Sequence, residues 1–515
     1  MTRLLLLLLA TVSAALLLAC SASTPRADAP ADAVLAPLRR EDALWLQRIG
    51  FGLDSVSVAQ YRRLGRERFL DAQLAAQDQQ LPPPIAAQIA ALDIAHADPA
   101  RALAEVNAQY KSINAMPDGA DKEQARKSLN DRGNKLAYEA QRRELLRALY
   151  SPSQLQEQMV WFWLNHFSVH QYKANVRWLI GDYEQRAIRP HALGHFYDLV
   201  LATLEHPAML QYLDNNQNAV GHLNENYARE LMELHTLGVD GGYSQYDVEQ
   251  LARVLTGVGI NFGDAPHLKP EWQPLYRRDG AFEFNPARHD FGSKVLLGVP
   301  VAGSGMAEVE HAVRQIVRTG ACAHFISHQI AIYFVADEPP PSLVTQMAQT
   351  FTRSDGDIAA VLRTMLLSRE FQAALGAKFK DPMRYVVSAV RFAYDGRPIA
   401  NSRPLLNWLN GLGEAPYNRP TPDGYPLTEA SWASSGQISR RFEIARAIGS
   451  GNAGLFDPED GSAAVSTGFP QLSSRLYFES VEPFLAAATR DALDHASTQQ
   501  EWNTFLLASP EFNFE

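Results

Sequence analysis

Two carboxylates, Glu230 and Glu233, stand about one helical turn apart in an apolar segment of the sequence. At about 100° per residue they fall on the same face of a helix. Two carboxylates with unequal surroundings can act as general acid and general base, which is what glycoside or related hydrolysis requires. His166 belongs to an Asn-His pair in a preceding apolar helix and is a candidate helper. We therefore predict that the catalytic residues are Glu230, Glu233 and His166.

Short polar residues around this pair are candidates for binding a substrate. Asn and Asp suit the interior of an exposed helix poorly, because their side chains compete for backbone hydrogen bonds. They favour a buried polar network or a lined cleft. His289 and Asp290 follow Asn285 and Pro286 in a predicted loop, where binding residues often lie, although a turn stabilised by Asp290 fits equally well. The predicted substrate-binding residues are Asn165, Asp214, Asn224, Asn226, Arg229, His289 and Asp290.

Two other interpretations of the same helix face stay open. Arg229 is spaced to pair with Glu225 and Glu233 on an exposed structural helix, at about 0.2 to 0.5 kcal/mol per pair. Alternatively, Glu230, Glu233 and His166, joined by Asp214 or His289, would supply oxygen and nitrogen ligands to a divalent metal. The sequence has no His-Glu-x-x-His motif and no cysteine pair, so no metal ligands are assigned and any cofactor is unknown.

Three nearby residues favour structural roles. His206 precedes Pro207 and is expected to cap or pack a helix end, because a residue before proline avoids the helical region. His235 lies in the last turn before a glycine, where a partial positive charge suits the helix dipole. Ser244, three residues before Asp247, is typical of a capping box.

Longer motifs around these residues closely resemble the bacterial "domain of unknown function 1800" family. They are WFWLNHF (161–167), HPAMLQYLD (206–214), NENYARELMELHTLG (224–238), YSQYDV (243–248) and HD (289–290). The resemblance runs from about Glu41, through RIGFG (48–52), to the SPEF near the C-terminus, and it implies an exported helical bacterial protein without an established chemistry. Two segments depart from the family pattern: 324–330, where a basic residue is usual, and 423–425, where a Gly-Trp pair is usual.

In most of the segments that must position these residues, apolar residues recur with the period of a helix. The predicted fold class is mainly α, a large multi-helix domain over 39–515 with a small β-ribbon insertion at about 257–301. Residues 282–284 and 295–298 are expected to pair as the ribbon. Helices are predicted at 57–76, 100–110, 121–149, 152–167, 183–204, 224–237, 245–256, 306–319, 321–334, 342–353, 357–374, 381–394, 402–410, 434–448, 479–492 and 497–508.

The N-terminus predicts export. Arg3 and the apolar run up to Leu18 are typical of a signal peptide over residues 1–19. The next residues, LLAC (17–20), resemble a bacterial lipobox, in which the chain is cut before Cys20 and its thiol carries the lipid; an ordinary cleaved signal with an incidental cysteine is the alternative. Residues 20–38 are rich in Ala, Pro, Ser and Asp and predict a flexible tether. Ser21 favours the outer membrane of the cell envelope.

The composition of the chain limits the classes of molecule that it is expected to bind. The formal net charge is −10, or about −11 once the signal is removed, which argues against nucleic acid and against electrostatic binding to anionic lipid. No phosphate-binding Gly-rich loop is present, so no nucleotide partner is expected. The membrane contact expected is the lipid anchor at Cys20, and Cys322 is then left as inert core. These observations predict an exported envelope lipoprotein, either a hydrolase of a polysaccharide or other extracellular polymer, a non-catalytic binding or assembly lipoprotein, or a divalent-metal protein.

Overall fold

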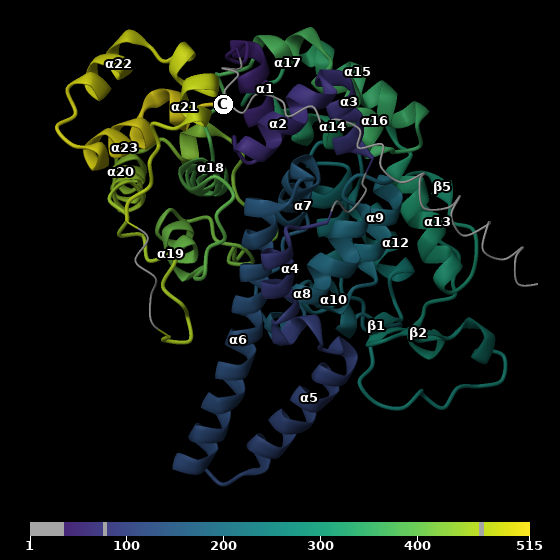
Figure 1. Cartoon of the computed structure of the whole chain (residues 1–515). Helices are drawn as coiled ribbons and strands as arrows, with labels where there is room; N and C mark the ends of the chain where they lie inside the picture. Colours follow the sequence, from purple (N-terminus) through teal and green to yellow (C-terminus); the bar gives the residue numbers. More distant parts are fainter. Residues whose placement is uncertain (1–35, 76–79, 463–467) are drawn as a thin grey trace, which may run out of the picture. The chain divides into compact units, whose positions relative to one another are not determined.

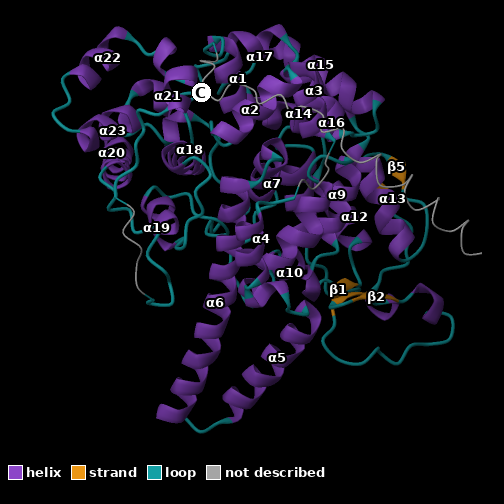
Figure 2. Cartoon of the chain, in the orientation of Figure 1, coloured by secondary structure: helices purple, strands orange, loops and turns teal. Residues whose placement is uncertain are grey.

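Helices account for most of residues 36–75, 80–462 and 468–515, which the computed structural model describes (Figure 2). The mainly α class with a small β insertion is confirmed. Contacts divide the chain into Met1–Pro37 and Leu38–Glu515. The predicted signal peptide, the lipidation site Cys20 and nearly all of the tether lie outside the described residues. No helix among those described is both long and apolar enough to cross a bilayer.

The first helices lead to a long helical hairpin. α5 and α6 lie side by side (Figure 1), and α6 matches the helix predicted at 121–149. Asp98 caps α5 by accepting hydrogen bonds from the backbone of Ala100 and Arg101. The part of α6 after Leu136 is mostly buried and carries the charged residues discussed below. The helices are α1 (Arg40–Ile49), α2 (Ser55–Leu64), α3 (Arg66–Leu74), α4 (Pro83–Ala90), η1 (Asp93–Ala95), α5 (Pro99–Ala115) and α6 (Ala120–Tyr150).

Helix α7 (Gln154–His166) is buried on all sides from its first residue to Leu164. Trp161 and Trp163 are 4% and 0% exposed, so both are core residues. The helix also buries polar side chains, and these bond to other parts of the fold, as Glu157 does to Arg189. Because α7 ends at His166, the Asn165–His166 pair stands where this central helix reaches the candidate site.

The following segment is less regular than predicted. The helix expected at 183–204 is wrong as one element, because Pro190 interrupts it. The helix expected at 224–237 begins as α-helix and continues as π-helix, with Leu237 N donating to Met232 O across five residues. The elements are η2 (Val176–Trp178), α8 (Ile180–Asp182), the π-helix η3 (Tyr183–Ile188), η4 (Arg189–His191), α9 (Phe196–Leu204), α10 (Pro207–Tyr212), η5 (Asn215–Gln217), α11 (Asn226–Glu230) and the π-helix η6 (Leu231–Thr236).

The β insertion contains two small antiparallel sheets, with strand orders β1-β3-β2 and β4-β5. The predicted pairing of 282–284 with 295–298 is wrong. Leu297 and Gly298 both have positive φ, so they turn the chain and pair β4 with β5 instead. The elements here are α12 (Gln245–Val254), β1 (Val258–Ile260), η7 (Gln273–Leu275), β2 (Arg277–Asp279), β3 (Phe282–Phe284), η8 (Pro286–Arg288), β4 (Val295–Leu296) and β5 (Val299–Pro300).

The C-terminal part is again helical. Ser368 caps a new helix and breaks the one predicted at 357–374. The helix expected at 479–492 is instead two helices with an irregular segment between them. The elements are α13 (Met306–Val317), α14 (Gly320–Phe334), α15 (Pro341–Arg353), α16 (Ile358–Leu366), α17 (Arg369–Ala373), α18 (Pro382–Tyr394), α19 (Arg403–Gly411), η9 (Glu429–Ser431), α20 (Ser435–Gly449), α21 (Arg475–Ser480), η10 (Glu482–Phe484), α22 (Ala487–Asp494), α23 (Gln499–Ala508) and α24 (Pro510–Asn513).

Candidate active site

The two predicted catalytic glutamates stand at the junction of α11 and η6. Glu230 ends α11 and Glu233 lies in the first turn of η6, and both are half-buried. Neither accepts a hydrogen bond or forms an ion pair with any described residue. Burial, followed by the negative charge of Glu233, raises the pKa of Glu230. Glu230 is therefore a carboxyl group that holds its proton more tightly than usual and has no structural partner.

A third carboxylate, Asp423, belongs to the same site. Its negative charge contributes to the raised pKa of Glu230, so the two groups lie close together. Partial burial opposes ionisation of Asp423, but hydrogen bonds from Arg419 and Thr421 outweigh it and lower the pKa. Arg419 Nη2 lies 2.8 Å from Asp423 Oδ2. We call Glu230, Glu233 and Asp423 the carboxylate cluster.

Asn165 positions the loop that carries Asp423. Its Nδ2 donates to Tyr425 O at 3.0 Å, and its Oδ1 accepts from Tyr425 N at 2.5 Å. Gly424 has φ +70, and a Cβ there would lie 2.4 Å from Asn165 O, so the loop requires glycine at this point. Tyr212 OH adds a 2.9 Å hydrogen bond to Pro420 O. The amide of Asn165 is thus engaged with the loop backbone.

His166 faces a cluster of aromatic rings. Its Nε2 donates to His235 O at 3.0 Å, and its ring stacks on Phe162 with centroids 6.1 Å apart. Burial lowers the pKa of His166 to about 4, so the ring is neutral at physiological pH. The contacts found for this ring within the described part of the chain include neither Glu230 nor Glu233. The structure therefore does not join His166 to the predicted carboxylates.

His235 is completely buried, and neither ring nitrogen has a hydrogen-bond partner among the described residues. Burial, then the neighbouring His166, lowers its pKa well below the usual value. A neutral ring cannot serve the helix dipole with a positive charge, so that expectation is wrong. By contrast, His206 caps α10 by accepting from Ala208 N, and Ser244 forms the predicted capping box with Asp247.

The predicted substrate-binding residues between 214 and 226 bond mainly to the backbone. Asn224 Nδ2 donates to Asp214 O at 3.1 Å, and Asn226 Nδ2 donates to Leu213 O at 3.0 Å. The carboxylate of Asp214, whose φ is +59, pairs with Lys173 at 2.9 Å. These contacts fix the start of α11 against the end of α10. They form a partly exposed polar network that places the helix carrying Glu230, and the role of these residues in binding a substrate stays a prediction.

Arg229 lies beside the carboxylate cluster. Its Nη2 donates to Glu225 Oε2 at 3.0 Å and to Gln245 Oε1 at 2.8 Å. The predicted pair with Glu225 is confirmed, whereas the predicted pair with Glu233 is not among the contacts of the described residues. Glu233 consequently keeps a carboxylate that no cation neutralises directly.

The sequence model of the family described as "Protein of unknown function (DUF1800)" matches residues 44–514. The chain belongs to this family. No curated protein and no solved structure matched it. In this DUF1800 member, the two segments expected to depart from the family pattern lie in different surroundings: the ring centroid of Phe325 is 6.2 Å from that of His166, and segment 423–425 holds Asp423 and the loop contact of Tyr425.

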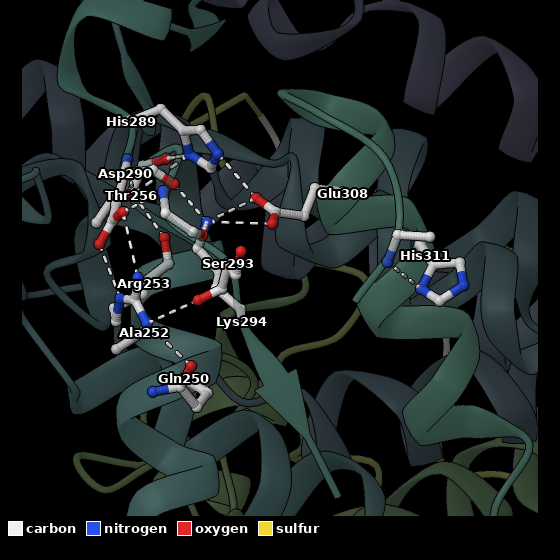
Figure 3. A network of polar contacts seen from close by, with 12 residues as sticks. Gln250, Ala252, Arg253, Thr256, His289, Asp290, Ser293, Lys294, Glu308 and His311 are labelled. Carbon is white, nitrogen blue, oxygen red and sulfur yellow. Dashed lines mark hydrogen bonds and ion pairs between the residues drawn. The ribbon is translucent and has the colours of Figure 1, made fainter. Parts of the chain in front are cut away.

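His289 and Asp290 belong to a separate polar network in this member of the family (Figure 3). The ring of His289 donates to Thr256 O at 2.7 Å and lies 2.9 Å from Glu308 Oε2, and buried Lys294 also bonds to Glu308 at 2.9 Å. Asp290 pairs with Arg253 at 2.8 Å. The network joins the end of α12, the loop after η8 and α13, and it shares no residue with the carboxylate cluster.

The metal hypothesis finds no ready site in the described residues. Within 36–75, 80–462 and 468–515, no group of three or more His, Cys, Asp and Glu side chains is arranged to hold a metal ion. The candidate ligands lie apart: Glu230 and Glu233 belong to the carboxylate cluster, His166 lies among aromatic rings, His289 belongs to its own network, and Asp214 pairs with Lys173.

The sequence reasoning missed a buried ionic cluster of three arginines and three glutamates between α6, α7, η3 and η4. Arg189 forms two hydrogen bonds to Glu157, at 3.0 and 2.8 Å, and Glu184 binds Arg143 at 2.6 Å and Arg147 at 2.9 Å. Charged residues inside apolar segments were the available signal. Its members are Arg143, Glu144, Arg147, Glu157, Glu184 and Arg189.

Proposed function

We propose that this DUF1800 member is an exported hydrolase that cleaves a polysaccharide or another extracellular polymer, with Glu230 as general acid. The observation that carries this proposal is the convergence of Glu230, Glu233 and Asp423 from two distant segments. Of these, Glu230 is unpaired with a raised pKa, whereas Asp423 is held ionised by Arg419. Unequal carboxyl groups at one place are what acid and base catalysis of glycoside cleavage requires.

In the proposed reaction, Glu230 gives its proton to the oxygen of the leaving group as the bond to that oxygen breaks. Glu233 accepts a proton from the attacking water, which forms the new bond to carbon. Asp423 does not exchange a proton, but its charge helps Glu230 remain protonated. Burial, followed by the charges of Asp423 and Glu230, raises the pKa of Tyr212, and burial, followed by the charge of Glu233, raises that of Tyr243, so both tyrosines lie near the carboxylates and could supply a ring to stack against a sugar.

The test compares the wild-type protein with Glu230→Gln on dye-coupled polysaccharides and purified peptidoglycan, with soluble dye or new reducing ends as the signal. On any polymer that the wild type cleaves, loss of a general acid should lower the rate about 100-fold or more. Glu225→Gln is the matched control, because Glu225 lies in the same segment but pairs with Arg229. Cleavage by Glu230→Gln at the wild-type rate would remove Glu230 from the acid role.

A second candidate is a non-catalytic binding or assembly lipoprotein, which the backbone contacts of Asn165, Asn224 and Asn226 favour. In that case the polar residues only fix helix positions. Glu230→Ala and His166→Ala should then both lower the Tm substantially, whereas in the hydrolase Glu230→Ala leaves the Tm unchanged or raises it. Thermal denaturation of the two variants distinguishes the candidates.

The location of the protein is part of the proposal. The signal-like residues 1–19 and the lipobox resemblance at 17–20 support cleavage before Cys20 and anchoring in the envelope through a lipid on its thiol, with Ser21 favouring the outer membrane. Cys20→Ser should abolish incorporation of labelled palmitate into the protein. Equal labelling of Cys20→Ser and wild type would contradict lipidation at this residue.

A further inference from the structure

A cavity of about 460 Å³ lies between α6 and residues 177–186, and residues 89–102 line its remaining wall. Its size falls in the range of small-molecule sites, about 300 to 1,000 Å³. It shares no lining residue with the carboxylate cluster or the His289 network. Neither the family resemblance nor the proposed hydrolysis uses it.

Arginines dominate the polar part of this wall. Arg143, Arg147, Arg177 and Arg186 line the cavity, whereas Asp182 is its one lining carboxylate. Arg177 bonds to the neutral Asn134 Oδ1 at 3.2 Å and forms no ion pair with a described residue. Arg186 is half exposed and pairs with solvent-exposed Asp279 at 3.0 Å and more distantly with Asp182, at 4.0 Å. Exposed pairs contribute little, so Arg186 can exchange Asp279 for a ligand.

The ionic cluster lies behind this wall of the cavity, and it does not cancel the positive charge of the arginines there. Glu184 already binds Arg143, Arg147 and Arg189. Burial, followed by the charge of Glu184, raises the pKa of Glu144 to about 8, so this carboxyl group is mostly protonated at neutral pH. Three arginines of the cluster then face two ionised carboxylates.

The orphaned polar atoms of the wall point to the same ligand chemistry. Arg143 Nε, Arg177 Nε and Trp178 Nε1 are buried without a hydrogen-bond partner among the described residues. All three are N–H donors. No contact among the described residues satisfies them, and the exposed ends of such arginines recognise carboxylate and phosphate oxygens in two-pronged contacts.

The rest of the wall is apolar, with Ile89, Ile94 and Leu136 among its members. A neighbouring cavity of about 220 Å³ shares Asp182 and Arg186 with this one, and Asp98, Glu205 and Asp279 also line it. Its four carboxylates outnumber its one arginine, whereas four arginines and Asp182 line the larger cavity. Of the two, the arginine-lined cavity is the one that attracts an anion.

We propose that the arginine-lined cavity binds a small amphipathic anion, whose carboxylate or phosphate group meets Arg177 and Arg186 and whose hydrocarbon part lies on Ile89, Ile94 and Leu136. The site is independent of the proposed hydrolysis, since it uses none of the same residues.

The test is calorimetric titration of the full-length protein with hexanoate, hexyl phosphate and 1-hexanol, which share one hydrocarbon chain. We expect either anion to bind at least tenfold more tightly than the alcohol. The double variant Arg177→Gln/Arg186→Gln should weaken binding of the anion about tenfold, because it removes both charges that meet the anion. Both side chains lie outside the ionic cluster, so the fold should persist. Arg440→Gln is the matched control, since it removes one exposed positive charge elsewhere.

The ratio of hexanoate to hexyl phosphate affinity identifies which oxyanion the site prefers, and either preference supports the proposal. Three results would overturn it: equal affinity for 1-hexanol and the anions, no binding of any probe at about 10 mM, or unchanged anion binding in the double variant. Circular dichroism of the double variant establishes that a loss of binding is not a loss of fold.

Discussion

Two segments of the described chain contain a π-helix within or beside which a glutamate lies, and they surround that glutamate in opposite ways. In η3, Glu184 is buried and binds Arg143, Arg147 and Arg189. Burial opposes ionisation of Glu184, yet the charges of the three arginines lower its pKa. At the junction of α11 and η6, Glu230 is half-buried, binds no described residue and has a raised pKa. The first glutamate is committed to structure, whereas the second is free to exchange a proton.

The difference arises from what each segment faces. Residues 143–147 of α6 present two arginines one helical turn apart to η3. The α11–η6 junction faces the loop with Asp423 and receives more negative charge. Glu184 lies within a π-helix and Glu230 directly before one, yet the first belongs to an ionic core and the second to a reactive surface, and substitutions should separate the two.

The largest effect is expected from Glu184→Gln. Removing one partner from a buried ionic cluster leaves three arginines without their shared carboxylate, which should lower the free energy of unfolding by about 3 to 5 kcal/mol. Urea denaturation at neutral pH measures the change. A loss below about 1 kcal/mol would mean that the cluster contributes little to the fold.

Asn165→Ala should have the next largest effect. It removes two hydrogen bonds to Tyr425 and leaves a buried backbone N–H without its acceptor, which should cost about 2 kcal/mol. Activity should fall as well, because Asp423 loses its fixed position beside Glu230. Asn165→Asp keeps the acceptor for Tyr425 N but sets a carboxylate oxygen against Tyr425 O, so it should also lose stability in the same unfolding experiment and shows the importance of the donor.

Glu144 offers a test through pH. Its pKa is raised in the folded protein to about 8, so the stability it contributes is complete below the unfolded pKa near 4.5 and is lost as pH rises through 8. Glu144→Gln should therefore flatten the decline of unfolding free energy between pH 5 and 8 by about 1 kcal/mol or more. An unchanged pH profile would show that Glu144 is ionised in the native protein.

The smallest effect on stability is expected from Glu230→Gln, at most about 0.5 kcal/mol, because the carboxyl group has no partner to lose. Its effect on catalysis should instead be large. In the wild type, the rate should fall as pH rises through the pKa of Glu230, since a general acid must be protonated. A rate that rises over that pH range would contradict the acid role.

The sequence was sufficient to predict the helical class, α6, the capping box at Ser244 and the shared face of Glu230 and Glu233. Prediction from the sequence failed where segments that are distant in the chain meet. Asp423 lies almost 200 residues from Glu230, and no local pattern marks their approach. The ionic cluster depends on α6 meeting η3, and periodicity cannot show which helices meet. The β4–β5 pairing was missed because a turn at Leu297 and Gly298 was read as part of a strand.

The buried ring of His235 has a consequence for the energy landscape of the fold. Both of its nitrogens lack partners among the described residues, and an unsatisfied buried polar group costs about 1 to 3 kcal/mol. This is local frustration, a conflict between one residue and the packing that otherwise favours the native state. Such conflicts concentrate at functional sites. Here the frustrated residue lies two positions after Glu233, and its carbonyl oxygen holds His166.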